Sequence, residues 1–270
     1  MNEDCQNLNV WTPACDGEKR PVLVWLHGGG FESGSAIEHI AYEGENMCRI
    51  GQVVVVSINH RLNILGYCDL SAYGEEYANS GNAGTDDIIA ALRWIQENIA
   101  EFGGDPDNVT LFGQSGGGAK ITTLLQTPAA DGLFAKGINM SGVIGPLLAD
   151  SKGDGEELAI ALMAEMGIDG DIHELETVPY DRLAEAYRRV KPEFAAAGKY
   201  TGCTPCPNAF YRGTPDENGF REETAQIPLL AGTVYGEFSG FIPTPYHGEK
   251  LTLEEGAKIV KEKVGEEEAA

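Results

Sequence analysis

A serine flanked by glycines, directly after an apolar run, restricts this chain more than any other feature. The stretch "NVTLFGQSGGGAK", residues 108–120, contains G-x-S-x-G at 113–117 with Ser115 at its centre. A serine hydroxyl is a weak nucleophile unless it is exposed, held rigidly and placed beside a base. A sharp turn from strand to helix meets the first two conditions, and Gly113 and Gly117 would let the two elements approach closely. The helical pattern "AKITTLLQ" follows, as the motif requires.

A phosphate-binding loop is the alternative reading of such a turn, and the spacing argues against it. The pattern G-x-x-x-x-G-K-[ST] starting at Gly113 needs a lysine where Ala119 stands, and Lys120 is followed by Ile121. A second glycine run, "LHGGGFESGS" at 26–35, follows the apolar stretch "PVLVW". Its uncovered N–H groups are of the kind that stabilise the oxyanion of acyl transfer.

The rest of the chain alternates between short apolar runs and helical patterns. We predict strands at the runs that end in turn residues, at 21–26, 53–59, 108–113, 136–142 and 227–233, with a further strand in "NLNVWT" near the start. The pattern "TDDIIAALRWIQENIAEFG" has helical periodicity and a glycine stop. These elements predict an α/β fold in one domain over residues 1–270, with a helical excursion at about 150–200.

Composition excludes some partners. The chain has 19 Lys and Arg against 42 Asp and Glu, a formal charge of −23, which repels nucleic acid and anionic membranes. No apolar run approaches a membrane span, and "MNEDCQNLNV" lacks the order of a signal peptide, so we expect a cytoplasmic protein. Of the six cysteines, Cys203 and Cys206 have redox spacing in "CTPC", but the prolines favour a loop over a redox site. We expect no metal and no cofactor.

Several long stretches resemble the type-B carboxylesterase, or cholinesterase-like, family of α/β-hydrolases. They are "EDCQNLNVWTP", "HGGGF", "INHRLNILGY", "GNAGTDDIIAALRWIQENIAEFGGDPDNVTLFGQSGGG" and "IPLLAGTVYGEFSGF". The resemblance implies a mostly parallel central sheet with helices on both faces. It also implies that Ser115 is the nucleophile, that Gly29, Gly30 and Gly116 form the oxyanion hole, and that Glu237 is the acid of the triad. Arg61 and Asp87 match positions that form a structural ion pair in the family.

Some features depart from the family pattern. Gln114 and Gly116 stand where many members have Glu and Ala, a change that keeps the Gly116 N–H. The cysteine that Cys5 matches is disulfide-bonded in secreted members, but its partner would lie upstream of residue 1. From the resemblance we expect a truncated α/β-hydrolase core, without the family's N-terminal and C-terminal segments and without the loop that bears the family's catalytic histidine.

The identity of the base therefore stays open. The family's triad order is Ser, acid, His, and His247 is the one histidine after Glu237. The other possibilities are His173 in the helical excursion, a histidine from a neighbouring subunit, or no proper base. We expect His27 and His60 to be structural, and His39 lies in a polar segment without a motif.

We expect an enzyme that hydrolyses small neutral carboxylic esters, with little discrimination among them, through an acyl-Ser115 intermediate. The alternative is a weak or inactive remnant that binds esters or protein partners, since a triad without its histidine loses most of its rate. Because the resemblance places the run at 227–233 at an uncovered sheet edge, we also expect a homo-oligomer.

Overall fold

The computed structural model describes residues 3–142, 155–237 and 252–264 of the 270-residue chain. The chain divides into two compact units, Met1–Thr233 and Val234–Ala270. The strands are β1 (Asn7–Trp11), β2 (Arg20–Leu26), β3 (Val54–Asn59), β4 (Gly104–Gln114), β5 (Lys136–Met140) and β6 (Leu229–Gly232). The α-helices are α1 (Glu45–Gly51), α2 (Asn63–Tyr67), α3 (Ala83–Asn98), α4 (Gly116–Leu125), α6 (Gly155–Met166), α7 (Tyr180–Ala196), α8 (Pro215–Asn218) and α9 (Leu253–Val264).

All six strands of the first unit form one sheet with the order β1-β3-β2-β4-β5-β6. Strands β2 to β6 pair in parallel, whereas β1 pairs antiparallel with β3. Runs of branched apolar residues form the central strands because both faces of a parallel sheet are covered. The six predicted runs are therefore confirmed as strands, and so is the mostly parallel sheet.

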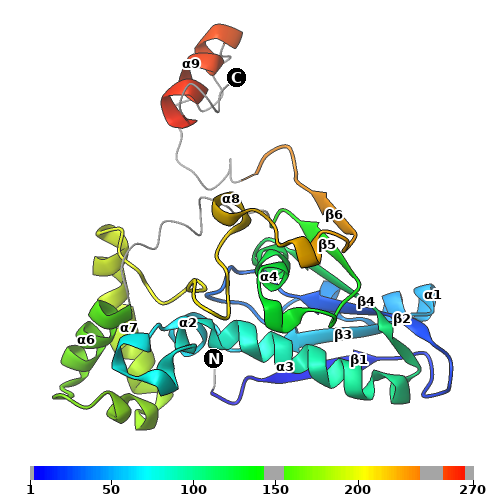
Figure 1. Ribbon diagram of the computed structural model, residues 1–270, viewed down its shortest axis with the longest axis horizontal. Coiled ribbons are helices and arrows are strands. Elements are labelled where there is room, and N and C mark those ends of the chain that lie inside the picture. Colours follow the sequence, from blue (N-terminus) through cyan, green and yellow to red (C-terminus); the bar gives the residue numbers. More distant parts are fainter. Residues whose placement is uncertain (1–2, 143–154, 238–251, 265–270) are drawn as a thin grey trace. The chain divides into compact units, whose positions relative to one another are not determined.

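One face of the sheet is covered by α3 and α4, which Figure 1 shows along the same side. Val24, Val56 and Leu111 lie side by side on three neighbouring strands, and all are fully buried beneath these helices. Truncating a buried leucine such as Leu111 to alanine removes about 2–5 kcal/mol of stability. Helix α3 runs into a 3₁₀ helix, Ile99–Phe102, and the chain turns at Gly103 with φ of 72°. This is the predicted glycine stop.

Helix α1 and the residues just before it cover part of the opposite face of the sheet. Trp25 points to this face, where its ring lies 4.9 Å from the Tyr42 ring and 5.0 Å from the Phe112 ring, centroid to centroid. The residue before α1, Gly44, lies so close that a Cβ there would be 2.7 Å from the side chain of Val55. The expectation of helices on both faces is confirmed.

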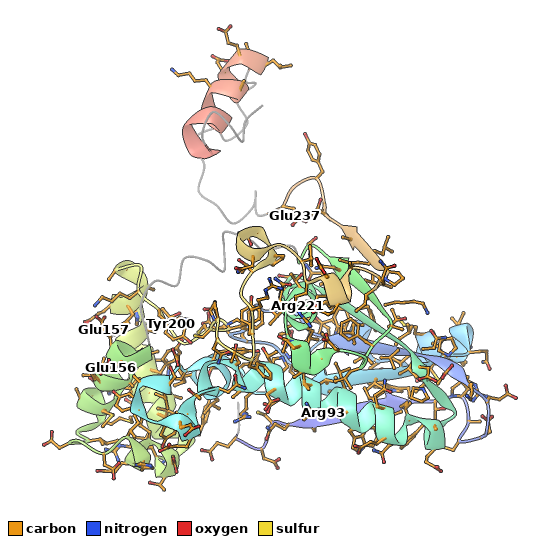
Figure 2. The ribbon with its side chains drawn as sticks, in the orientation of Figure 1. Arg93, Glu156, Glu157, Tyr200, Arg221 and Glu237 are labelled. Atoms are coloured by element: carbon orange, nitrogen blue, oxygen red, sulfur yellow. The ribbon has the colours of Figure 1, made fainter. Side chains whose placement is uncertain are left out.

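Helices α6 and α7 lie within the predicted excursion at about 150–200 and have an apolar core of their own. Their buried residues include Leu158, Leu162, Met163, Ala186 and Val190. Tyr187 donates to the carbonyl of Thr201 at 2.7 Å, and Tyr200, labelled in Figure 2, is 2% exposed. In the described part of the excursion, α6 and α7 thus form a small helical layer whose place in the chain order is between β5 and β6.

The second unit contains α9, which begins with a capping box. The Thr252 hydroxyl accepts from the Glu255 N–H at 3.2 Å, and the Glu255 carboxylate accepts from the Thr252 N–H at 2.8 Å. This reciprocal pair satisfies two donors at the start of the helix. Within the described residues, no helix is long and apolar enough to cross a membrane.

Candidate active site

Ser115 occupies a strained turn between the end of β4 and the start of α4 (Figure 1). Its φ of 55° and ψ of −122° are uncommon for a residue with a side chain. The turn is held on both sides, since the Ser115 N–H donates to the carbonyl of Met140 at 2.8 Å and its carbonyl accepts from the Ala119 N–H at 3.0 Å. Strain that the surroundings maintain in this way is typical of a functional position.

The glycines around Ser115 permit a close approach of strand and helix. A Cβ at Gly113 would lie 2.5 Å from the carbonyl carbon of Gly117. A Cβ at Gly117 would lie 2.0 Å from the carbonyl oxygen of Leu26. Neither site has space for a side chain, so the structure has the close approach that the motif predicts.

The glycine run after β2 lies against this turn. We call residues 27–35 the glycine loop. Gly29 and Gly30 have positive φ values of 89° and 62°, which a side chain would disfavour. A Cβ at Gly28 would lie 3.7 Å from the Cβ of Ser115, and a Cβ at Gly116 would lie 2.3 Å from the nitrogen of Gly30. The structure therefore brings Gly30 to Gly116 at the Ser115 turn.

Hydrogen bonds stabilise the glycine loop. The carbonyl of Gly29 accepts from the N–H groups of Glu32 and Ser33 at 3.3 and 3.1 Å. The carbonyl of Phe31 accepts from the Asn63 N–H at 2.8 Å. The Phe31 ring is 2% exposed. The loop is thus fixed at its turn and at the residue that follows the glycines.

Two imidazoles stack on each other, one at the first residue of the glycine loop and one directly after β3. The rings of His27 and His60 are 5.3 Å apart, centroid to centroid, and both side chains are buried. Each Nδ1 lies 2.8 Å from a carbonyl oxygen, of Gly28 and Arg61 respectively. Since a carbonyl only accepts, each Nδ1 carries the hydrogen. Burial and the Lys120 charge lower the pKa of His27 to about 3 and that of His60 well below its usual value. Both rings stay neutral and buried, in agreement with the structural role we expected.

Lys120 is a residue of this site that the motif analysis missed. It lies on α4 with 1% of its surface exposed, and its Nζ donates to the carbonyl of His27 at 2.8 Å. Burial lowers the pKa of this lysine to about 7. A lysine inside the apolar pattern "AKITTLL" was the available signal, because lysines are rarely buried without a specific partner.

Asn139 on β5 was also missed. Its side chain is 1% exposed and donates to the Gly118 carbonyl and the Thr122 hydroxyl of α4, both at 3.1 Å. It fixes the first turn of α4 to the sheet. Nothing in the local sequence distinguishes it from other polar residues that follow an apolar run.

Arg61 and Asp87 form the ion pair that the resemblance implies. The guanidinium donates to both carboxylate oxygens, at 2.7 and 2.9 Å, and the Arg61 N–H donates to the same carboxylate at 2.9 Å. Gln6 on the N-terminal segment donates to it at 2.6 Å. The pair therefore ties the start of the chain and the end of β3 to α3.

The remaining candidates have different surroundings. The Glu237 carboxylate, in the second unit, accepts from the Val234 N–H at 2.8 Å. His247 lies outside the described residues. His173 is exposed, and its Nδ1 lies 2.8 Å from the Asp171 carboxylate, which raises the pKa of the imidazole. His39 is exposed and packs edge-on against the Tyr42 ring.

The six thiols are free in the structure. Cys203 and Cys206 lie in a loop, as expected; Cys203 is buried and Cys206 is half-buried. Burial raises the pKa of both thiols, that of Cys206 to about 12. A redox site needs an accessible thiolate, so this environment argues against one. Among the described residues, no group of three or more His, Cys, Asp or Glu side chains could hold a metal ion.

Comparisons with known proteins agree with the geometry. A model of the carboxylesterase family matches residues 1–268. Para-nitrobenzyl esterase of Bacillus subtilis (strain 168) is 42% identical over 187 residues, which are 69% of this chain and 37% of that protein. Phenmedipham hydrolase of Pseudarthrobacter oxydans is 40% identical over 211 residues, 78% of this chain and 40% of that protein.

Solved structures are similar as well. An esterase from anaerobic Clostridium hathewayi, which can hydrolyze aliphatic aromatic polyesters, is 52% identical with a TM-score of 0.85, and the match covers 97% of this chain and 52% of that chain. A carboxylesterase of Geobacillus stearothermophilus is 35% identical with a TM-score of 0.70 over 97% of this chain and 54% of that chain. This chain thus spans about half the length of these solved relatives.

Proposed function

Because the chain belongs to the carboxylesterase family and has the α/β-hydrolase fold, we propose that it hydrolyses small neutral carboxylic esters through an acyl-serine intermediate on Ser115. One observation carries this proposal: the strained Ser115 turn lies in backbone contact with the glycine loop, at Gly116 and Gly30. A nucleophile and uncovered N–H donors at one place are what acyl transfer requires.

In the proposed reaction the Oγ of Ser115 attacks the ester carbonyl carbon, and its proton passes to the base. The N–H groups of Gly29, Gly30 and Gly116 donate to the oxyanion that forms. The tetrahedral intermediate then loses its alcohol, which takes the proton from the base, and leaves the acyl group on Ser115. Water then attacks the acyl carbon and gives a proton to the base. As the second tetrahedral intermediate collapses, the bond from the acyl carbon to the Ser115 Oγ breaks, the base returns the proton to that oxygen, and the carboxylic acid leaves.

We assign Glu237 as the acid of the triad and His247 as the base. Glu237 is supported by its match to the family position, and His247 by the order of the triad along the chain. Alanine variants at 39, 173 and 247 test the base, because loss of the true base should lower kcat by about 10³-fold or more. Near wild-type turnover of His247→Ala would refute its assignment.

The substrate class follows from charge and from the relatives. A net charge of −23 disfavours anionic esters. The Clostridium hathewayi esterase acts on aliphatic aromatic polyesters, which supports the acceptance of both aliphatic and aromatic acyl groups here. We therefore propose broad acceptance of small neutral esters, with preferences below about a hundredfold between homologues. A steeper preference in a series of p-nitrophenyl esters would contradict this.

We further propose that the chain forms a homo-oligomer, and a cytoplasmic location stays a prediction. Strand β6 is the last strand of the described sheet, and Leu229 and Leu230 are 38% and 67% exposed on it. Exposed apolar edge strands tend to pair with another chain. A second copy is the proposed occupant, and a monomeric mass by light scattering at micromolar concentration would refute it.

Turnover of p-nitrophenyl butyrate tests the proposed function. We expect hydrolysis by the wild type and its loss in Ser115→Ala, whereas Ser71→Ala, an exposed serine in a short 3₁₀ helix, should retain wild-type turnover. Equal turnover by the wild type and Ser115→Ala would overturn the proposal and favour a remnant that binds esters or partners without converting them.

A further inference from the structure

Lys120 contacts both ends of the glycine run. Its Nζ donates to the carbonyl of His27, the residue before Gly28, at 2.8 Å. The same Nζ lies 6.0 Å from the centroid of the Phe31 ring, which follows Gly30, at the limit of a cation–π contact. One buried amine thus interacts with the residue before the three glycines, Gly28 to Gly30, and with the residue after them.

The position of Lys120 on α4 links this contact to the other oxyanion donor. Gly116 begins α4, and Lys120 lies four residues later. Residues four apart lie on the same face of a helix. Both therefore face the glycine loop: Gly116 through its backbone against Gly30, and Lys120 through its side chain to His27.

Burying this amine costs free energy that its interactions must offset. Placing a lysine in an apolar interior is unfavourable unless its donors are paired, and its pKa is lowered here because its charged form is desolvated. The nearby rings of His27 and His60 carry no charge, and the acidic group that acts on the amine, Glu38, raises its pKa. A methionine would fill the same space without this penalty, so packing alone does not explain the lysine.

We propose that Lys120 is a positioning residue that fixes the glycine loop relative to α4, so that the N–H groups of Gly29, Gly30 and Gly116 point at one oxyanion. The proposal rests on the proposed function. Lys120 itself does not contact the substrate; it acts through the His27 carbonyl. Loss of this link leaves the nucleophile in place but loosens two of the three donors.

The first test measures the loop directly and needs no substrate. Hydrogen exchange by mass spectrometry follows the amides of Glu32 and Ser33, both bonded to the Gly29 carbonyl. We expect exchange in Lys120→Met to be at least about tenfold faster there, with β3 unchanged. Lys120→Gln has nearly the same size but keeps a donor, so it should restore part of the protection. If the loop amides of folded Lys120→Met exchange as in the wild type, or if Lys120→Gln gives no more protection than Lys120→Met, the proposal is wrong.

The second test separates positioning from stability. Thr123→Val is the matched control, because Thr123 is buried on the same helix but its hydroxyl donates to the Ala119 carbonyl of its own helix. With p-nitrophenyl butyrate we expect Lys120→Met to lower kcat about 100-fold with KM within about threefold, and Thr123→Val to change neither. Wild-type kcat in Lys120→Met would overturn the positioning role. No Ser115-dependent turnover in the wild type would instead refute the proposed function, and the exchange measurement would still decide on Lys120.

Discussion

The backbone of Gly116 touches the backbone of Gly30, and a Cβ at position 116 would lie 2.3 Å from the Gly30 nitrogen and 2.5 Å from its Cα. One contact thus joins the start of α4 to the middle of the glycine loop. Contacts of this kind set the distance between oxyanion donors that come from separate segments, and rates depend steeply on that distance.

Gly116→Ala should therefore impair acyl transfer, although many family members carry Ala at the matching position. The new methyl group has to displace the Gly30 N–H, and we expect kcat to fall by about 10²-fold, the effect of losing one oxyanion donor. Kinetics with p-nitrophenyl butyrate measure this. Gly17→Ala is the control, because a Cβ there would meet nothing within 4 Å. A kcat within about twofold of the wild type would show that the glycine loop can move to make room for the methyl group, and that the contact does not position the donors.

Lys120 should make the free energy of unfolding depend on pH between about 7 and 10. Its pKa falls from the usual 10.5 to about 7 on folding, so between these values the unfolded chain binds more protons than the native chain. Stability therefore rises with pH through this window and is lost as pH falls toward 7. Urea unfolding gives the free energy of unfolding of each protein. The value for the wild type, relative to that for Lys120→Met, should rise between pH 7 and about 10. A constant difference would mean that the amine keeps an ordinary pKa.

Arg221, labelled in Figure 2, should stabilise the fold through Asp131. Its side chain is 5% exposed and donates to both carboxylate oxygens, at 2.8 and 2.6 Å. Asp131→Asn leaves the buried guanidinium with the more distant carboxylate of Glu223, 3.6 Å from its Nε, and we expect a loss of about 1–3 kcal/mol in the free energy of unfolding. Glu185→Gln, in an exposed pair with Arg189, should change it by less than about 0.5 kcal/mol. Equal losses in both variants would contradict this account.

The thiols should differ in reactivity. Cys15 is exposed, whereas burial raises the pKa of Cys68 and of Cys206 to about 12. Because the thiolate is the reactive form, iodoacetamide at pH 8 should alkylate Cys15 well before the other two. Peptide mapping of the native protein measures the order. Fast labelling of Cys206 would reopen a redox role for the C-x-x-C loop.

The sequence predicts the sheet well because its strands are apolar runs with turn residues at their ends, and Ser115 stands out because its turn needs a distinctive set of glycines. The antiparallel direction of β1 was not predicted, since "NLNVWT" carries no signal of direction. Lys120 and Arg221 were missed because their partners, His27 and Asp131, lie 93 and 90 residues away. Pairing at that range depends on the packing of whole elements. The roles of Glu237 and His247 stay predictions, for they rest on resemblance and chain order.

A fluorophosphonate probe tests the central claim most directly, because it reacts with an activated serine and leaves a stable adduct. After the protein is labelled at neutral pH, intact mass and peptide mapping give the number and position of adducts. Our account predicts one adduct, on Ser115, absent from Ser115→Ala and present in Ser71→Ala. An adduct on another residue, or none on the folded wild-type protein, would contradict it.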